Sequence, residues 1–279
     1  TTGSQSCSPL PAGVGAAPYT PASMDIDPLQ SFRLDGRVAV VTGASSGLGD
    51  RFARVLAAAG ARVVVAARRA ERLDALVSEL PDAYAVPCDL TTPGAPENLV
   101  AATLEHYGRV DIVVNNAGVS DPYPALEEST EHFRSVVELN LVAPFELARA
   151  AAVSMVDNGG GSIVNVASIS GLVGTGQIPE AGYAASKGGL VNLTRELAAQ
   201  WARRGVRVNA LAPGWFRSEM TEGAMFGDEK AERWMRNRTP MGRGGEPHEL
   251  DGALLFLAGD ASTFVTGAVI SVDGGWTAI

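Results

Sequence analysis

The amino-acid sequence predicts an α/β fold with a doubly wound, mostly parallel sheet of seven strands and helices on both faces. From Arg37 onward, short β-branched runs alternate with helical patterns, an order typical of a parallel sheet whose strands are joined by helices. The runs are almost continuously apolar, as strands covered on both faces require. With 279 residues, 46% of them hydrophobic, the chain is long enough to bury one large core.

Seven segments have the character of buried strands. They span residues 38–41, 62–65, 84–86, 111–114, 162–166, 206–208 and 268–272. Right-handed crossovers between them produce the doubly wound arrangement. The helix between the first two strands is expected over residues 48–59, because Gly60 suits the left-handed conformation that often follows a helix C-terminus.

The first 30 residues differ from the rest of the chain. They are rich in Ser, Pro, Ala and Gly and lack apolar periodicity, so residues 1–30 are predicted to be a disordered N-terminal tail. Residues 31–279 are predicted to form a single folded domain.

Composition argues against several classes of protein. A net charge of -9 disfavours nucleic-acid and anionic-membrane partners, because both require a basic face. Cys7 and Cys88 are too few for a disulfide framework or a thiolate metal site, which fits a cytoplasmic location. No apolar stretch of membrane-spanning length and no secretory signal are seen. The three histidines, His106, His132 and His248, show neither metal-ligand spacing nor carboxylate partners, so no metal site is expected.

A glycine-rich turn follows the first predicted strand directly. It reads Thr-Gly-Ala-Ser-Ser-Gly-Leu-Gly over residues 42–49, and a helix begins inside it. Glycines allow the backbone to approach a pyrophosphate, while the N–H groups at the helix start attract its charge. This context favours dinucleotide binding over a purely structural turn. The candidate cofactor ligands here are Gly43, Ser45, Ser46, Gly47 and Leu48.

The cofactor type is predicted from the end of the second strand. An acidic residue there would bind the ribose hydroxyls of NAD, whereas an arginine accepts the 2′-phosphate of NADP. The sequence offers Ala66-Ala67-Arg68-Arg69, with no carboxylate before Glu71. Because a planar guanidinium binds phosphate in bidentate fashion, Arg68 predicts NADP(H) as the cofactor, with NAD(H) as the alternative.

Tyr183 and Lys187 form the strongest candidate for catalysis. They open a helical pattern, and a spacing of four residues places the phenol and the ammonium on one helical face. We expect the positive charge to lower the pKa of the phenol, which then gives or takes the proton of an alcohol during hydride transfer. An ordinary surface pair is the alternative interpretation of this spacing alone.

With these motifs in this order, the chain resembles the short-chain dehydrogenase/reductase family from about Leu34 to its C-terminus. The resemblance implies a Rossmann-type dinucleotide-binding and catalytic domain. It implies that Asn140 holds a water of a proton relay, that Ser168 hydrogen-bonds the substrate oxygen, and that Lys187 also binds the nicotinamide ribose. The implied catalytic set is Asn140, Ser168, Tyr183 and Lys187. The further residues implied to contact the cofactor are Asp89, Leu90, Asn116, Ala117, Gly118, Pro213, Gly214, Ser218 and Met220, together with Tyr183 and Lys187.

Several points remain open at this stage. The linker 174–182 before the tyrosine is slightly long for the family, so Ser170 competes with Ser168, although Ser-x-x-Gly favours Ser168. Either serine also suits a simple strand-end cap, and Asp89 also suits a turn cap. Glu180, in the same linker, is interpreted as a solvated charge rather than a substrate contact.

The segment after the sixth predicted strand suggests a substrate pocket. Residues 228–238 read as an amphipathic helix. Trp215, Met225, Phe226 and Trp234 surround it and predict either apolar pocket walls or simple core packing.

The predicted function is therefore hydride transfer between NADP(H) or NAD(H) and a secondary alcohol/ketone pair. A ketoreductase that acts on apolar or acyl-carrier-type ketones resembles much of the family. The segment 212–221 also resembles sugar-acid members such as gluconate 5-dehydrogenases, which is one alternative. A catalytically silent dinucleotide-binding regulator is the other. The resemblance further implies a homotetramer that packs through the helical segments at about 129–155 and 183–203.

Overall fold

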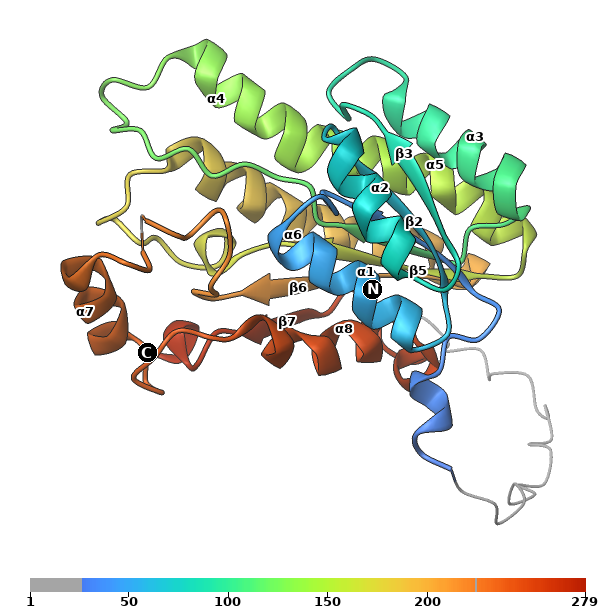
Figure 1. Cartoon of the computed structure of the whole chain (residues 1–279). Helices are drawn as coiled ribbons and strands as arrows, with labels where there is room; N and C mark the ends of the chain where they lie inside the picture. The colour runs from blue at the N-terminus through green and yellow to red at the C-terminus, as the bar shows by residue number, and fades with distance from the viewer. Residues whose placement is uncertain (1–26, 224) are drawn as a thin grey trace, which may run out of the picture.

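The computed structural model describes residues 27–279 apart from Ala224, so most of the predicted N-terminal tail lies outside the described residues. Seven strands form one sheet in the order β3-β2-β1-β4-β5-β6-β7, and every neighbouring pair is parallel (Figure 1). The strands are β1 Val38–Thr42, β2 Arg62–Ala67, β3 Ala83–Pro87, β4 Ile112–Asn115, β5 Gly161–Val166, β6 Val206–Pro213 and β7 Val269–Val272. All seven predicted strands are confirmed, and so is the fold class.

Helices follow most strands. They are α1 Gly47–Ala58, α2 Ala70–Glu79, α3 Ala95–Tyr107, α4 Thr130–Val137, α5 Ala143–Asp157, α6 Ala181–Trp201, α7 Glu229–Arg238 and α8 Asp251–Ala258. A π-helical turn, η2 Glu138–Val142, joins α4 to α5. The short 3₁₀ turns are η1 Gln30–Phe32, η3 Ile169–Gly171, η4 Ala202–Arg204, η5 Pro247–Leu250, η6 Asp260–Ser262 and η7 Trp276–Ala278. The predicted helices at 48–59 and 228–238 correspond to α1 and α7.

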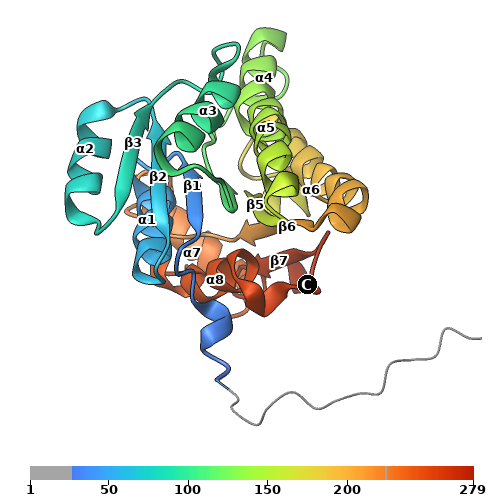
Figure 2. The ribbon, with the colours of Figure 1, turned by 90° about the vertical axis from the view of Figure 1, so that its right-hand side faces the viewer.

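The two faces of the sheet bury separate hydrophobic clusters. Alternate residues of β1 show the division, because Ala39 and Val41 belong to one cluster and Val38 and Val40 to the other. Buried side chains of α1, α2 and α8 complete the first cluster, and those of α3, α5 and α6 complete the second. Figure 2 shows α1 and α8 on one side of the strands and α3, α5 and α6 on the other. Coverage on both sides explains why the strands are apolar throughout.

The strand order places a crevice beside β1. The chain runs from β1 outward to β2 and β3 and then returns to β4 on the opposite side of β1. Connections leave the carboxyl ends of β1 and β4 in opposite directions, and ligands of doubly wound sheets bind at this switch point. The glycine-rich turn after β1 lies at this edge.

One continuous helix joins α4, η2 and α5. This helix, Thr130–Asp157, has 28 residues, and its most apolar window has a mean hydropathy of 1.3. Within the described residues it is the one helix that is long and apolar enough, by length and composition, to cross a membrane. Half of this window is buried inside the fold. No unbroken apolar run in the sequence has this length. The helix contacts α3 and α6.

Close packing of the backbone fixes the turn after β1. Gly43 has a φ of +67°, and a Cβ there would lie 2.9 Å from the Cα of Ala117. A Cβ on Gly49 would collide with the carbonyl oxygen of Gly43 and lie 2.6 Å from Nδ2 of Asn116. The third glycine therefore allows α1 to pack directly against the turn from which it starts.

We predict that Gly49→Ala destabilises the protein. The atom nearest to the added methyl group is a backbone carbonyl oxygen, which cannot move aside as a flexible side chain can, and such overpacking costs about 1–3 kcal/mol. Gly252→Ala is the matched control, because this glycine also lies in a helix and a Cβ there meets nothing within 4 Å; it should be neutral or stabilise by up to ~1 kcal/mol. The free energy of unfolding in urea measures both, and equal stability of the two variants would contradict the packing argument.

Candidate active site

The predicted site residues gather around two adjoining hollows at the carboxyl edge of the sheet. The outer groove includes Gly43, Ser45, Ser46, Arg68, Asp89, Leu90, Ala117, Gly118 and Met220 among its lining residues. The inner cavity, of about 330 Å³, includes Leu48, Asn116, Gly118, Ser168, Tyr183, Lys187, Pro213, Gly214, Ser218 and Met220. Gly118, Ser120 and Met220 line both, so the two hollows meet. Of the remaining candidates, Gly47 is the first residue of α1 and lies next to Ser218, and Asn140 lies directly behind Gly118.

The ends of β1 and β4 are tied together by hydrogen bonds. The hydroxyl of Thr42 accepts from the backbone N–H groups of Asn116 and Ala117, both at 3.0 Å. In return, Nδ2 of Asn116 donates to the carbonyl of Thr42 at 2.9 Å. These bonds hold the glycine-rich turn and the Asn-Ala-Gly turn side by side as one wall of the site.

Arg69, not Arg68, contacts the serines of the glycine-rich turn. Its guanidinium donates to the hydroxyls of Ser45 at 3.1 Å and Ser46 at 2.6 Å. It also pairs with Glu219, where the arginines lower the pKa of the carboxyl to about 2. Arg68 lines the outer groove but is exposed. The prediction singled out one arginine, whereas two guanidinium groups border the groove.

The start of α1 leaves its backbone donors available. Ser46 is the N-cap residue, yet its side chain makes no capping hydrogen bond because it accepts from Arg69 instead. Uncapped N–H groups and the positive end of the helix dipole suit an anionic group.

Asp89 has the geometry of the turn cap considered from sequence. One carboxylate oxygen accepts from the backbone N–H of Thr91 at 3.0 Å and from its hydroxyl at 2.7 Å. These bonds lower the pKa of Asp89. Asp89 and Leu90 both line the outer groove, so the cap fixes the carboxylate at the edge of this groove.

Asn140 links three segments behind the inner cavity. The side chain lies in η2, is fully buried, and exchanges hydrogen bonds of 2.9 Å with the backbone N–H and carbonyl of Val119. It also donates to the hydroxyl of Ser186 at 3.1 Å. A Cβ on Gly118 would lie 3.1 Å from Oδ1 of Asn140 and 3.4 Å from Nζ of Lys187, so the glycine lets the two polar side chains approach the cavity wall.

Tyr183 and Lys187 lie together on the first turns of α6, as their spacing predicted. Nζ of Lys187 is 5.6 Å from the centre of the Tyr183 ring and donates to the carbonyl of Val166, at the end of β5, at 2.8 Å. Burial lowers the pKa of Lys187 to about 8. The ammonium is therefore held in place by a strand-end carbonyl.

The prediction that the Lys187 ammonium lowers the pKa of the Tyr183 phenol is wrong, because that pKa is raised. The phenol borders the cavity on a side chain that is half-buried, and desolvation raises the pKa of Tyr183 to about 12. The nearby hydroxyl of Ser168 lowers this pKa, and the negative charge of Glu180 raises it. Desolvation opposes ionisation of the phenol, and it outweighs the contribution of Ser168.

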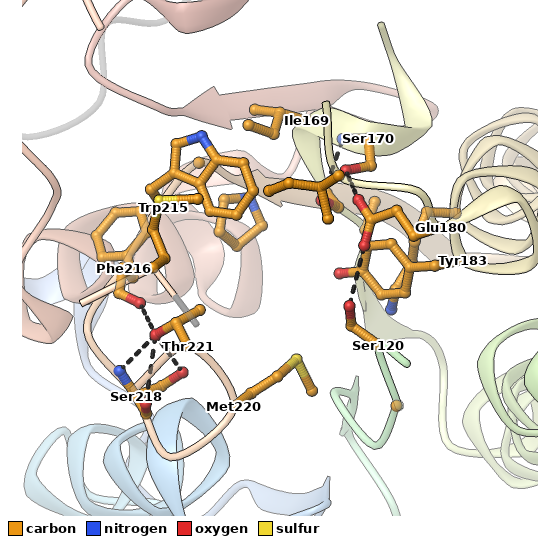
Figure 3. A pocket seen from close by; sticks show the side chains of 18 of the residues that line it. Ser120, Ile169, Ser170, Glu180, Tyr183, Trp215, Phe216, Ser218, Met220 and Thr221 are labelled. Carbon is orange, nitrogen blue, oxygen red and sulfur yellow. Dashed lines mark hydrogen bonds between the residues drawn. The ribbon is translucent and has the colours of Figure 1, made fainter. Parts of the chain in front are cut away.

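The wall opposite Tyr183 is apolar. Trp215 and Met225 line the inner cavity, while Phe226 and Trp234 pack behind them in a cluster that includes Trp276. The interpretation as a pocket wall is therefore confirmed for Trp215 and Met225, and the interpretation as core packing for Phe226 and Trp234. Thr221 fixes the loop at this wall by donating to the carbonyl of Phe216 at 2.6 Å and accepting from the N–H of Ser218 at 3.0 Å (Figure 3).

His132 does have carboxylate partners, contrary to the sequence prediction. Its ring nitrogens lie 2.9 Å from Glu128 and 3.1 Å from Asp121. Within residues 27–279 without Ala224, the structure contains no group of three or more potential ligands that could hold a metal ion.

Sequence reasoning missed Arg69, Ser120, Glu180 and Glu219 as residues of the site. Glu180 is 8% exposed and lines the inner cavity beside Tyr183 (Figure 3), so its interpretation as a solvated charge is wrong. The absence of any Lys or Arg in the linker 174–182 was an available signal, because a carboxylate without a local partner there had to be solvated or used.

Comparison with known proteins agrees with the fold and the site. Residues 43–277 match the family model described as enoyl-(acyl carrier protein) reductase. The chain belongs to the short-chain dehydrogenase/reductase family.

Relatives within this family share most of their length with the chain. Galactitol 2-dehydrogenase (L-tagatose-forming) of Cereibacter sphaeroides is 45% identical over 88% of this chain and 97% of the relative. Gluconate 5-dehydrogenase of Gluconobacter oxydans is 42% identical over 88% and 96%. A solved gluconate 5-dehydrogenase from Burkholderia cenocepacia, in complex with NADP and tartrate, has a TM-score of 0.85 and 35% identity and covers 91% of this chain and 100% of its own.

The chain is thus an NAD(P)-dependent oxidoreductase that interconverts a secondary alcohol and a ketone. Its residues fit a nicotinamide dinucleotide, because glycines, uncapped helix N–H groups, hydroxyls and guanidinium groups line the outer groove. These relatives are named as enzymes, so they lend no support to the alternative of a silent regulator.

Proposed function

We propose that the chain is an NADP(H)-preferring dehydrogenase/reductase of hydroxylated secondary alcohols, with residues 31–279 acting as one Rossmann-type unit. The observation that carries this proposal is the convergence of Ser168, Tyr183 and Lys187 on the inner cavity, with Asn140 directly behind it. A nicotinamide dinucleotide held by the outer groove would supply or accept the hydride. Tyr183 then gives or takes the proton of the substrate oxygen.

Ser168 rather than Ser170 is proposed to hold the substrate oxygen. The hydroxyl of Ser168 lies near the Tyr183 phenol and lowers its pKa. Ser170 is committed elsewhere, because its hydroxyl donates to Glu180 at 2.8 Å. The backbone N–H of Ser170 donates to the Ser168 oxygen at 3.1 Å and so fixes its position.

The raised pKa of Tyr183 determines which direction of the reaction the phenol suits at neutral pH. With a pKa of about 12 the phenol is protonated, which suits donation to a ketone oxygen during reduction. Oxidation of an alcohol needs an acceptor for the proton, so its rate should rise as the pH rises. Lys187, with a pKa of about 8, is mostly charged at neutral pH and binds the ribose hydroxyls in the proposed complex.

Tyr183→Phe should lower kcat by about 10²–10⁴-fold, because it removes the proton-transfer group and little else. NADPH binding, measured by fluorescence titration, should stay within about threefold of the wild type. Tyr84→Phe is the matched control, since Tyr84 lies on β3 and is absent from the lining of both hollows. A fully active Tyr183→Phe enzyme would refute the catalytic assignment.

The preference for NADP(H) is supported by the charges at the end of β2. Arg68 and Arg69 line the outer groove next to Ser45 and Ser46. Guanidinium and hydroxyl donors together match the oxygens of a 2′-phosphate. The carboxylate of Glu219, which Arg69 holds in the described structure, occupies the kind of position that such a phosphate would take.

Arg69→Ala should weaken NADPH binding about 10- to 100-fold, the range for loss of a charge-assisted contact, and NADH binding far less. Arg68→Ala should have the same sign. Arg33→Ala, which removes an exposed guanidinium bonded to Asp35, is the control. Dissociation constants for both nucleotides decide the matter, and equal losses for NADPH and NADH would remove the phosphate argument.

We also propose that the chain assembles as a homotetramer in the cytoplasm. The assembly is supported by apolar side chains that the helices α4 and α5 leave exposed, namely Phe133, Phe145 and Val153. Val153 is 66% exposed, and burial against another copy would remove this surface from water. The cytoplasmic location is supported by the free thiol of Cys88.

Sizing by light scattering at micromolar concentration should give four times the mass of one chain. Val153→Glu should produce smaller species, because a charge would be buried at the contact. Leu126→Glu, at a fully exposed position before α4, should leave the tetramer intact. A monomeric wild type would contradict this proposal.

A further inference from the structure

Glu180 places a buried carboxylate in the inner cavity, next to the proposed acid/base. It is the residue before α6 and lies three positions ahead of Tyr183. The hydroxyl of Ser170 donates to Oε1 at 2.8 Å, and the hydroxyl of Ser120 donates to Oε2 at 2.9 Å. Figure 3 shows this group facing Trp215, Phe216 and Met220 across the cavity.

The carboxylate of Glu180 joins the loop at Ser120 to Ser170, yet no cation that the structure describes balances its charge. Glu180 is the N-cap residue of α6, yet its side chain makes no capping hydrogen bond. Its two hydrogen-bond partners are neutral serines, and no ion pair to it is present among the described residues. Burial raises the pKa of Glu180, and the two hydroxyls lower it only in part. Burying a carboxylate without a cation is costly, and a neutral side chain could also join two serine hydroxyls, so the charge itself points to a role at the cavity.

The charges around the inner cavity exclude one class of ligand. Among its lining residues in the described part of the chain, Glu180 and Lys187 are the charged ones. Lys187 donates to the Val166 carbonyl and is proposed to bind the nicotinamide ribose. Within the same part of the chain, no guanidinium, imidazole or second ammonium lines the cavity to hold a substrate carboxylate. A sugar acid would bring its negative charge toward Glu180, and the two charges would repel each other.

The same group suits a substrate that carries several hydroxyls. Each oxygen of Glu180 accepts one serine hydroxyl, and a carboxylate oxygen accepts two hydrogen bonds. One acceptor position per oxygen therefore remains for a substrate O–H. The hydroxyl oxygens of Ser120 and Ser170 also accept, so the three side chains match neighbouring hydroxyls of a polyol.

We propose that Glu180, Ser120 and Ser170 form a hydroxyl-recognition subsite, which selects neutral polyols and their hydroxyketones over sugar acids. The subsite rests on the proposed function, because it positions the substrate carbon whose oxygen faces Tyr183. Glu180 carries the selectivity through its charge, and the two serines hold the carboxylate in the cavity. A simple alcohol without a second hydroxyl makes no use of it.

Three substrates separate this subsite from the rest of the site: galactitol, sodium gluconate and cyclohexanol, each oxidised with NADP by the wild-type enzyme. We expect kcat/KM for galactitol to exceed that for gluconate by at least about tenfold, the size of one charge-assisted hydrogen bond. This comparison needs no variant. A preference for gluconate, or an equal rate with cyclohexanol and galactitol, would overturn the proposal.

Glu180→Gln and Glu180→Ala test the residue itself. Both should lower kcat/KM for galactitol about 10- to 100-fold, whereas that for cyclohexanol, compared at the pH optimum of each enzyme, should fall far less. The ratio of gluconate to galactitol turnover should rise in both. Glu127→Gln, an exposed carboxylate in the loop before α4, is the control. Equal losses for galactitol and cyclohexanol would assign Glu180 to structure instead.

The pH profile adds a readout that a purely structural role would not move. The charge of Glu180 raises the pKa of Tyr183, so Glu180→Gln should shift the rise of cyclohexanol oxidation toward lower pH. An unshifted profile would contradict contact between the carboxylate and the reacting end of the cavity. Absence of activity with every alcohol would instead refute the proposed function, because the wild type would then lack the reaction that the subsite serves.

Discussion

Desolvation at the carboxyl ends of β5 and β6 is the constraint on which the rest of the site depends. It raises the pKa of the Tyr183 phenol and lowers that of the Lys187 ammonium. Both changes favour the neutral form of the group. At neutral pH the phenol beside the cavity is therefore protonated, which suits the proposed role of an acid.

Hydrogen bonds between strand ends maintain this desolvated cavity. Thr42 and Asn116 join the loops after β1 and β4, and Asn140 joins the loop at Val119 to α6 through Ser186. The Val166 carbonyl holds Lys187. The proposed chemistry therefore lies where the segments that follow β1, β4 and β5 meet, which is the general location of ligand sites in doubly wound sheets.

The sequence predicted the sheet well because strand burial leaves a direct composition signal. The main error concerns β6, predicted to end at residue 208 but continuing to Pro213. Asn209 breaks the apolar run, yet it is fully buried and bonds through both side-chain atoms to the segment before β7, at Val265 and Ala268. A polar residue satisfied by a distant segment cannot be recognised from local composition.

The site was predicted less completely, for a related reason. Motifs located the glycine-rich turn, Ser168, Tyr183 and Lys187, because their spacing is local. By contrast, Arg69 bonds to a serine of the turn and Glu180 bonds to Ser120 through contacts between distant segments, which local spacing does not reveal. The pKa of Tyr183 was misjudged because helical spacing reports the neighbouring charge but not the burial of the pair.

Titration of the Tyr183 phenol tests the central claim most directly. Tyrosinate absorbs in the ultraviolet, so the difference between the wild type and Tyr183→Phe, recorded against pH without nucleotide, reports this one group. We predict no ionisation of Tyr183 up to pH 10, the ordinary tyrosine value, because its pKa is raised to about 12. Tyrosinate that forms near pH 7 and is absent from the variant would contradict the account.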